Sequence, residues 1–463
     1  MQFEDPPAAT TAASPEATTG PWYAGLTRYH WFVLIVAALG WMFDTMDQQL
    51  FTLARRPALA ALMHLPQSDP QIQKAAGSAT MIFMIGWALG GLGFGILGDR
   101  IGRAKTMLVT IVLYSIFTGL SAFSHGYVDF VIYRFLTGLG VGGEFAVGVA
   151  LVAEVMPDRA RPYALGWLQA LSAIGNMTAA LVSMTLGYLQ KSGTIASEWR
   201  GMFLFGVAPA LLALPIFFKL KEPERWKRAA GAESHDAAGR KLGSLKELFG
   251  NPRWRRNTLV GMSLAFAGVV GLWGIGFFAV DLVRLVFEKH FAAQGLSPQQ
   301  YAGDLTWWAG ITSLLQNAGG FLGVYAFSKV TGIIGRKPAF AISFLLAMFA
   351  TAFTFWTLDH FWQIFVLLPL MGFCQLTLFG GYAIYFPELF PTRLRSTGTS
   401  FCYNVGRLIA AVGPYGLGLL TSQVFLGYDE PMRYAGVTMC GVFLIGLIAL
   451  PFAPETKGQP LPE

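Results

Sequence analysis

Charged side chains inside apolar runs are the residues of this sequence that could do chemistry. Asp44 and Asp47 lie in the first apolar run, and Arg134 and Glu144 lie in the fourth. A charge at the centre of a bilayer costs at least ~2.5–3.5 kcal/mol on insertion scales, so such residues face a cavity or a partner. A carboxylate beside an arginine stays ionised until another group competes for the arginine, and protonation then frees that arginine. These residues therefore predict a site that binds and releases protons.

Asp44 and Arg134 lie at similar predicted depths, each about 10 Å from the same end of its helix at 1.5 Å per residue. Adjacent helices would bring the two side chains together, so Asp44 is the preferred proton-binding residue and Asp47 is the second choice. The alternative interpretation is a static buried ion pair. Asp281 and Arg284 lie one turn apart in the seventh run, where they either neutralise each other or form a further charged site.

Arg407 could bind an anion, because it lies ten residues into the eleventh run and therefore about 15 Å deep. A guanidinium at that depth can hold a carboxylate through two parallel hydrogen bonds. Other polar residues near the midplane could complete the site, although each taken alone is more often a helix-packing residue. These residues are Tyr403, Asn404, Gln169, Asn176, Gln316, Asn317, Gln375 and Tyr382.

The elements that must position these residues are twelve apolar runs of about 20 residues, the length of a membrane-spanning helix. The chain is 54% hydrophobic and 13% charged, with a mean hydropathy of +0.50, which is too apolar for a soluble globule. Unbroken apolar runs predict an all-α membrane protein, because helices satisfy their own backbone groups in hydrocarbon. The runs lie near 31–53, 77–97, 106–125, 128–156, 164–189, 200–219, 257–288, 305–328, 338–357, 361–388, 397–424 and 433–453.

Two pairs of landmarks recur about half the chain apart. Glu154-x6-Arg161 recurs as Glu388-x6-Arg395, and Gly102-Arg103 recurs 233 positions later as Gly335-Arg336. Such a repeat is typical of a membrane protein with two pseudo-symmetric six-helix halves. The expected units are a disordered tail 1–27, an N-terminal half 28–219, a linker 220–256, a C-terminal half 257–453 and a tail 454–463.

Basic residues predict the orientation in the membrane. Most of the 33 Lys and Arg residues lie in the N-terminal segment, the even-numbered connections and the C-terminal tail. The positive-inside rule therefore places both termini, the linker and the tail in the cytoplasm. The net charge of +7 follows from this topology, so no nucleic-acid partner is expected. The first twenty residues lack the basic start and cleavage site of a signal peptide.

Several other chemistries find no support in the sequence. Gly138-Leu-Gly140-Val-Gly-Gly143 matches a dinucleotide-binding fingerprint, but it lies inside an apolar run with no preceding strand and instead predicts close helix packing. The six histidines lie near run ends or in loops, and all three cysteines lie within runs. We therefore expect no metal, no cofactor and no disulfide framework. Because no nucleophile–base set is found either, an enzyme is not expected.

The loops resemble those of the major facilitator superfamily. Gly95-Ile-Leu-Gly-Asp99-Arg100-Ile-Gly102-Arg103 resembles its signature loop, and Glu222-Pro-Glu-Arg-Trp226 and Pro454-Glu-Thr-Lys-Gly458 resemble motifs of its sugar-porter and organic-ion branches. The resemblance covers nearly the whole chain. It implies a cytoplasmic gate in which loop charges pair across the helix ends; the alternative is that these charges only solvate those ends. The gate residues would be Asp99, Arg100, Arg103, Glu154, Arg161, Arg336, Glu388 and Arg395. In the second signature loop Ser328-Lys329 replaces the Asp-Arg pair, which implies a weaker gate there.

The resemblance also points to the charged runs. Phe43-Asp44-Thr45 and Arg134-x3-Gly-x-Gly are similar to the coupling positions of proton-coupled sugar porters. Aromatic-acid:proton symporters carry Asp-Gly-x-Asp in the first span, which this chain matches only imperfectly around Asp44 and Asp47. In the repeat, Glu144 aligns with Leu378 and Arg134 with Leu368. Only the N-terminal half keeps the titratable residues of this span, so we expect proton coupling there.

The implied activity is secondary active transport by alternating access. Sugar porters carry Gln-Gln-x-Ser-Gly in the seventh span and Pro-x-x-Trp in the tenth, and this chain has neither. A Gly-Arg such as Gly406-Arg407 is found in aromatic-acid symporters, so we expect proton-coupled uptake of a small organic anion. The alternatives are a proton-coupled sugar or other neutral-solute symporter, or a sensor that kept the fold but lost transport. We expect a monomer in a cell inner (plasma) membrane, with lipid, protons and the anion as its partners.

Overall fold

The computed structural model describes residues 20–66, 69–233, 241–296, 298–410 and 419–463, and these residues form helices without a single strand. The first half contains α1 (Arg28–Met63), α2 (Pro70–Arg100), α3 (Arg103–Ser121), α4 (Tyr127–Val155) and α5 (Arg161–Lys191). Its sixth span combines α6 (Glu198–Phe205), a 3-10 turn at Ala208–Leu212 and α7 (Ala213–Lys219). The predicted tail 1–27 lies outside the described residues as far as residue 19.

The second half follows two short helices, α8 (Glu224–Glu233) and α9 (Leu245–Gly250). Its seventh span is α10 (Pro252–Val269), which continues through the π-helical stretch Val270–Ile275 into α11 (Gly276–Ala293). Next come α12 (Pro298–Ile334), α13 (Arg336–Thr357) and α14 (Ile364–Leu389). The eleventh span begins as α15 (Arg395–Ala410) and ends in a π-helical stretch at Leu420–Val424, and the twelfth combines α17 (Pro431–Met439), α18 (Phe443–Ala449) and 3-10 turns at Cys440–Val442 and Leu450–Phe452.

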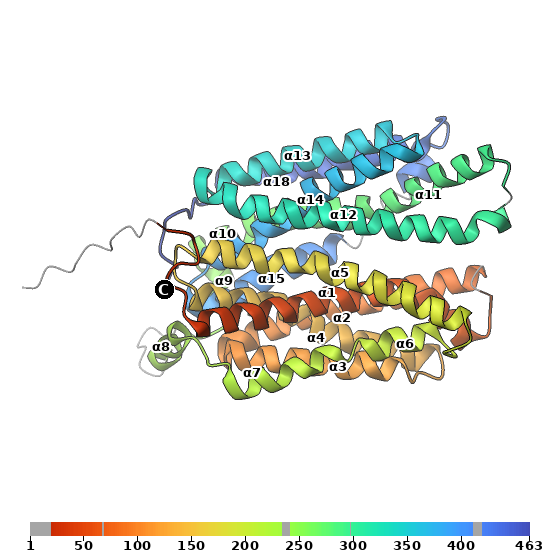
Figure 1. Ribbon diagram of the computed structural model, residues 1–463. Helices are drawn as coiled ribbons and strands as arrows, with labels where there is room; N and C mark the ends of the chain where they lie inside the picture. Colours follow the sequence, from red (N-terminus) through yellow and green to blue (C-terminus); the bar gives the residue numbers. More distant parts are fainter. Residues whose placement is uncertain (1–19, 67–68, 234–240, 297, 411–418) are drawn as a thin grey trace, which may run out of the picture.

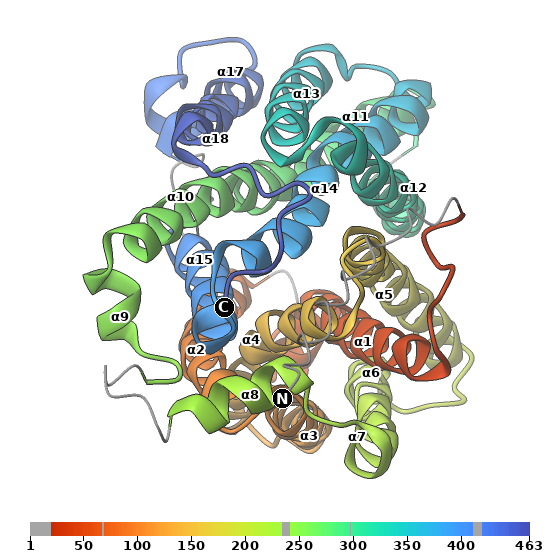
Figure 2. The same ribbon diagram turned by 90° about the vertical axis from the view of Figure 1, so that its left-hand side faces the viewer.

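The expected fold class is confirmed. Within the described residues, nine helical segments are long and apolar enough to cross a membrane. Figure 1 shows the spans as two stacked bundles of roughly parallel helices, with α1 to α7 below and most of the second half above. Helices α5 and α12 meet between the bundles, as do α2 and α15, which Figure 2 shows end-on. The C-terminus, α8 and α9 lie at one end of the molecule, which we call the termini end.

The internal repeat has a physical counterpart at the start of the third span of each half. Gly102 and Gly335 precede α3 and α13 with φ of +114° and +98°, a conformation that favours glycine. Glu222 accepts hydrogen bonds from two backbone N–H groups at the start of α3, at 3.1 and 3.2 Å. Glu455, 233 positions later, does the same at the start of α13, at 2.9 and 3.0 Å. Burial raises the pKa of Glu455, but these N–H donors outweigh it and hold that pKa below its usual range.

Glycines hold α2 and α4 close together, as the glycine-rich run predicted. A Cβ on Gly142 would lie 2.5 Å from the backbone nitrogen of Gly91, and one on Gly90 would lie 2.5 Å from the Cα of Leu139. Contacts this short leave no room for a methyl group, because the opposing atoms are backbone. The glycines therefore set the spacing of the two helices that carry much of the central site.

We predict that Gly90→Ala destabilises the protein by roughly 1–3 kcal/mol, the usual cost of overpacking. Thermal unfolding of the purified protein in detergent, followed by intrinsic fluorescence, measures this loss. Gly93→Ala on the same helix is the matched control, because a Cβ there meets no atom within 4 Å. Equal melting temperatures for the two variants would contradict the packing argument.

Candidate functional site

Arg134 pairs with Asp47 and not with Asp44. Its Nη1 lies 3.7 Å from Asp47 Oδ2, and both side chains are fully buried. Thr118 donates a hydrogen bond to the other oxygen of Asp47 at 2.7 Å. The predicted contact between Asp44 and Arg134 is therefore wrong, since the two residues form no ion pair within 4.0 Å. The depth predicted from sequence is that of the Arg134 Cα atom. The guanidinium lies several ångströms away from the Cα atom along the helix.

Several neighbours fix the orientation of Arg134. Ser121 Oγ accepts from its Nε at 3.0 Å and from its Nη2 at 2.7 Å, and Thr137 Oγ1 accepts from Nη2 at 3.0 Å. The guanidinium carbon also lies 4.6 Å from the centre of the Phe203 ring. Because acceptors, an aromatic face and one carboxylate surround it, Arg134 together with Asp47 has the character of a structural ion pair.

Asp44 has a different environment. It is fully buried, and neither carboxylate oxygen has a hydrogen-bond partner among the described residues. Its charged neighbours are Glu144, Asp47 and Arg407. A buried carboxylate without hydrogen bonds is costly when ionised, so this group is suited to carrying a proton.

Glu144 lies beside the same turn of α1. Thr110 donates to its Oε2 at 2.7 Å. A Cβ on Gly40, one turn before Asp44, would collide with Glu144 Oε1 and would lie 3.0 Å from the Met107 methyl carbon. The glycine thus makes room for the second carboxyl group. Two acids, one from α1 and one from α4, therefore share a dry region of the N-terminal half.

Arg407 reaches this region from the other half of the molecule. Its guanidinium carbon lies 3.6 Å from the centre of the Trp87 ring on α2 and 4.5 Å from that of Tyr403. Its Nη2 donates to the Tyr403 hydroxyl at 3.0 Å. Stacking on an indole holds the guanidinium plane in one orientation. The arginine also interacts electrostatically with Asp44, so the predicted anion site and proton site are neighbours.

A row of aromatic rings connects the two sites. The Trp41 and Phe145 ring centroids are 4.8 Å apart, and those of Phe145 and Tyr403 are 4.2 Å apart with nearly parallel planes. The row joins α1, α4 and α15. Sequence reasoning missed Trp87 and Phe145. The sequence feature that could have identified Trp87 is its position as an aromatic residue among small residues, between Gly86 and Gly90.

Three of the other predicted polar residues lie where the halves meet or close to it. Asn176 Nδ2 donates to Asn317 Oδ1 at 3.1 Å, which joins α5 to α12. Asn404 Nδ2 donates to Ser400 O at 3.1 Å, and its amide lies directly against Gly91.

The remaining predicted polar residues make local contacts. Gln169 Nε2 is 3.4 Å from Ser172 Oγ, and Gln316 packs against Gly372. Tyr382 donates to Leu264 O at 2.6 Å and Gln375 to Thr351 Oγ1 at 2.8 Å, both within the C-terminal half. The side chains of Asp281 and Arg284 lie outside those that the structure describes.

Glu154 is the centre of the charge network at the termini end. Its Oε1 accepts from Arg103 Nη2 of its own half at 2.8 Å and from Arg395 Nη1 of the other half at 2.8 Å. All three side chains are fully buried. Arg103 also donates to Thr392 O across the halves at 2.6 Å. The network therefore closes the molecule at this end.

Asp99 reinforces the same closure. Its carboxylate accepts from the backbone N–H groups of Ser396 and Thr397 at 3.1 and 2.8 Å and from Thr397 Oγ1 at 2.6 Å. It therefore caps the start of α15, where the helix dipole favours a negative charge. Arg100 is more peripheral, with its Nε 3.4 Å from Leu242 O.

The contacts of Glu388 and Arg161, which the internal repeat relates to Glu154 and Arg395, differ from those of the Glu154 network. Glu388 accepts from Arg336 Nε and Nη2 at 3.0 and 2.8 Å, and both residues belong to the C-terminal half. Arg161 pairs with Asp158 on its own side, and no ion pair between Arg161 and Glu388 lies within 4.0 Å. The sequence offers a reason, because Ser328 stands where the first half has Asp99. Its hydroxyl donates to Tyr325 O of its own helix at 2.7 Å.

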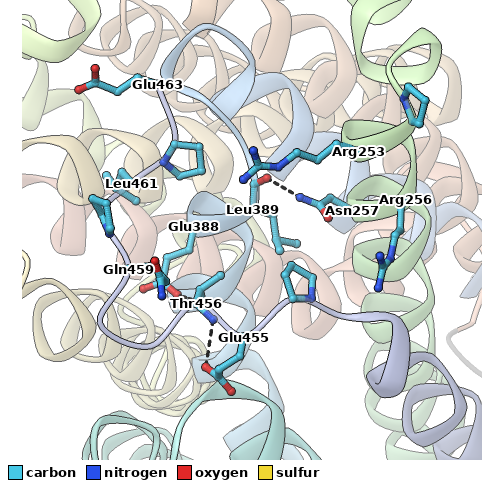
Figure 3. Close-up of a pocket in the computed structure, with 14 residues that line it drawn as sticks. Arg253, Arg256, Asn257, Glu388, Leu389, Glu455, Thr456, Gln459, Leu461 and Glu463 are labelled. Atoms are coloured by element: carbon cyan, nitrogen blue, oxygen red, sulfur yellow. Dashed lines mark hydrogen bonds between the residues drawn. The ribbon is translucent and has the colours of Figure 1, made fainter.

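The C-terminal tail borders a cavity of ≈ 820 Å³ at the termini end, between Glu388 and the first turn of α10. Figure 3 shows Glu388, Thr456 and Glu455 on one side of it and Arg253, Arg256 and Asn257 on the other. Thr456 Oγ1 donates to Glu388 Oε2 at 2.5 Å. Glu388 is therefore hydrogen-bonded by the tail and by Arg336, and its interaction with Arg161 of the opposite half is electrostatic, without an ion pair within 4.0 Å.

Comparison with known proteins decides the family. The model of the family described as "Sugar (and other) transporter" matches residues 42–251 and 260–457. The chain belongs to this family. It is therefore a major facilitator transporter and not an enzyme, as the loop motifs predicted.

Individual relatives of the transporter extend over nearly its full length. A probable 4-methylmuconolactone transporter of Cupriavidus pinatubonensis is 30% identical over 90% of this chain and 89% of its own. A cis,cis-muconate transport protein of Acinetobacter baylyi is 27% identical over 79% of this chain and 83% of its own. The proton:xylose symporter XylE of E. coli has a similar fold, with a TM-score of 0.74, 21% identity and coverage of 94% of this chain and 98% of its own.

We predict that Glu154→Gln opens the interface between α2 and α15, because it removes the carboxylate shared by the two halves. A cysteine placed at the fully buried Ser400 reports this opening through its rate of labelling by a membrane-impermeant maleimide added at the termini end. We expect an increase on the order of tenfold or more, since breaking a buried ion pair is costly.

Glu388→Gln is the matched control for this experiment, because its hydrogen-bond partners lie in its own half. It is expected to leave the labelling rate near that of the parent Ser400→Cys protein. Equal acceleration by both glutamine variants would show that the two gate charges are equivalent, contrary to the geometry.

Proposed function

We propose that this transporter moves a small organic anion, an aromatic or short-chain carboxylate, together with protons. The observation that carries the proposal is the juxtaposition of Arg407 with Asp44. The first belongs to the C-terminal half, the second to the N-terminal half, and their charges interact. Arg407 would bind the substrate carboxylate, and Asp44 would carry the proton.

The charge inventory of the site supports coupling. Among its described buried residues, three acids (Asp44, Asp47 and Glu144) are accompanied by two cations (Arg134 and Arg407). Arg134 pairs with Asp47, and Arg407 is the cation that interacts with Asp44. An anion bound at Arg407 displaces that compensation, so the neighbouring acid binds a proton more readily. Because this linkage is reciprocal, a proton on Asp44 also favours anion binding.

The resulting cycle is symport. One proton moving through about 150 mV releases roughly 3.5 kcal/mol, but a monoanion carried with it costs the same amount, so its accumulation draws on the pH gradient or on a second proton. Glu144, held by Thr110, adds a like charge that makes the ionised form of Asp44 less favourable. The row formed by Trp41, Phe145 and Tyr403 supplies flat apolar faces beside the guanidinium.

The relatives' names support the anion class. Two of them are named for muconate and methylmuconolactone transport. The likeness to the xylose symporter concerns the fold, so it does not favour a sugar. The buried arginine supports an anion as the substrate, because a neutral sugar needs no cation at that depth.

Orientation and location are part of the proposal. We infer that the termini end faces the cytoplasm and that the protein is a monomer in an inner (plasma) membrane, because basic residues gather at this end. The closed network around Glu154 then corresponds to a cytoplasmic gate that is shut. Breaking it during the alternating-access cycle would expose the site to the cell interior.

We predict that Asp44→Asn abolishes carboxylate-induced proton uptake into proteoliposomes while leaving the melting temperature near that of the wild type. Its oxygens lack hydrogen-bond partners in the described structure, so an amide loses few contacts. External pH, recorded as benzoate, muconate or xylose is added, measures the coupling. Alkalinisation by xylose alone would favour the sugar symporter instead.

Asp47→Asn is the matched control for Asp44→Asn. It leaves Arg134 as a buried cation without its carboxylate, so we expect a loss of stability of roughly 3–5 kcal/mol. A stable but uncoupled Asp47→Asn protein, together with a coupled Asp44→Asn protein, would transfer the proton-binding role to Asp47.

We predict that Arg407→Ala abolishes carboxylate uptake and that Arg407→Lys retains at most a small fraction of it. Lysine keeps the charge but loses the bidentate geometry and the planar stack on Trp87. Uptake of radiolabelled benzoate, with benzamide as a neutral competitor of the same shape, measures the effect. Normal benzoate uptake by the alanine variant, or equal competition by benzamide, would exclude an anion site at Arg407.

A further inference from the structure

A groove on the outer surface lies between α10 and the last span. Its volume is ≈ 550 Å³. On α10 it is lined at helical spacing by Pro252, Arg255, Arg256, Leu259, Val260 and Ser263, and on the facing helix by Ile445, Ile448, Ala449 and Phe452. Both stripes follow the i, i+3, i+4 rule, so each presents one continuous face to the groove.

The groove is amphipathic along its length. The arginines lie in the first turns of α10, at the termini end, and the residues beyond them are apolar. Leu259, Ile448 and Phe452 are 53%, 68% and 59% exposed. From Arg255 to Ser263 the helix rises about 12 Å. This length spans the outer part of one membrane leaflet. The groove thus has a charged mouth at the termini end and an apolar channel that runs from there along the two membrane-spanning helices.

Among the described residues, no acidic side chain forms an ion pair with the arginines at the mouth of the groove. Arg255 and Arg256 are exposed, and no acidic side chain of the described residues lies within 4.0 Å of either guanidinium. Arg256 Nε donates to Phe452 O at 2.9 Å, which fixes this side chain at the point where the two helices meet. Glu455 belongs to the neighbouring cavity, and backbone N–H groups at the start of α13 bind its carboxylate.

We propose that this groove binds one anionic phospholipid. The phosphate of the headgroup lies between Arg255 and Arg256, and one acyl chain lies along Leu259, Ile445 and Ile448. Basic pockets between membrane helices suit anionic headgroups, and each interfacial cation strengthens such binding. The apolar channel distinguishes a lipid from a free phosphate, because only a lipid fills both parts. The proposal is independent of the transported solute and of the proton site.

Native mass spectrometry of the full chain in detergent tests this site, with phosphatidylglycerol and phosphatidylcholine of identical acyl chains as the probes. We expect phosphatidylglycerol to be retained at lower concentration by the wild type. Arg255→Gln combined with Arg256→Gln should weaken that binding on the order of 30-fold and leave phosphatidylcholine binding unchanged. Equal retention of the two lipids by the wild type would overturn the proposal.

Two further variants separate the groove from general surface charge. Lys241→Gln combined with Lys246→Gln removes two exposed cations of the α8–α10 connection outside the groove, and we expect it to leave phosphatidylglycerol binding unchanged. Ile448→Trp fills the channel with both arginines intact, and we expect it to lose the lipid. Equal weakening by the lysine and arginine pairs, or full binding by Ile448→Trp, would overturn the site. Competition by glycerol phosphate alone at similar concentration would do the same, because it would show that the channel contributes nothing.

Discussion

One carboxylate, that of Glu154, holds the two halves of the molecule together at the termini end. It accepts hydrogen bonds from Arg103 on one side and Arg395 on the other, and all three groups are removed from solvent. Among the described residues Glu154 is the carboxylate that pairs with Arg395, whereas Arg103 also pairs with Asp99 at 3.0 Å; an unpaired buried guanidinium is far costlier than a paired one. The closed state of the transporter therefore depends on two acids of the N-terminal half, Glu154 and Asp99, which both bind the start of α15.

The repeat does not make this closure symmetric. Glu388, the counterpart of Glu154, is bound by Arg336 and by the tail residue Thr456, and both lie in its own half. The counterpart of Asp99 is Ser328, which cannot cap the facing helix as a carboxylate does. Gating by charge thus belongs mainly to the contact between α2 and α15. The contact between α5 and α12 relies on packing and on Asn176 with Asn317.

The fold could be predicted from the sequence for a clear physical reason. A span must be apolar and about 20 residues long, so composition alone marks the helices. Repeat spacing then yielded the halves, and the paired motifs at Gly102 and Gly335 have matching geometry. The internal 3-10 and π-helical stretches, such as Val270–Ile275, were not predicted, because no rule of periodicity marks them.

The site was less accessible, because depth along a helix does not determine which way a side chain points. Arg407 was found from its depth, and its place beside the Trp87 ring came only from the structure. Arg134 was assigned to the wrong aspartate, since one helical turn separates Asp44 from Asp47 and an arginine side chain spans more than that. Sequence therefore identifies which charged residues belong to the site. Knowing which long side chains pair with one another requires the tertiary structure.

Because Arg134 pairs with Asp47 and not with Asp44, the two aspartates have different environments in the site. Asp47 is already held by a cation and a threonine. Asp44 lacks such contacts in the described structure and is next to a like charge, so its ionised form depends on Arg407. Because Asp44 and Arg407 belong to different halves, any movement between the halves changes their separation. In the proposed function, the motion that exposes a bound anion to one side of the membrane would thereby change the proton affinity of the acid, which is the property that coupled transport requires.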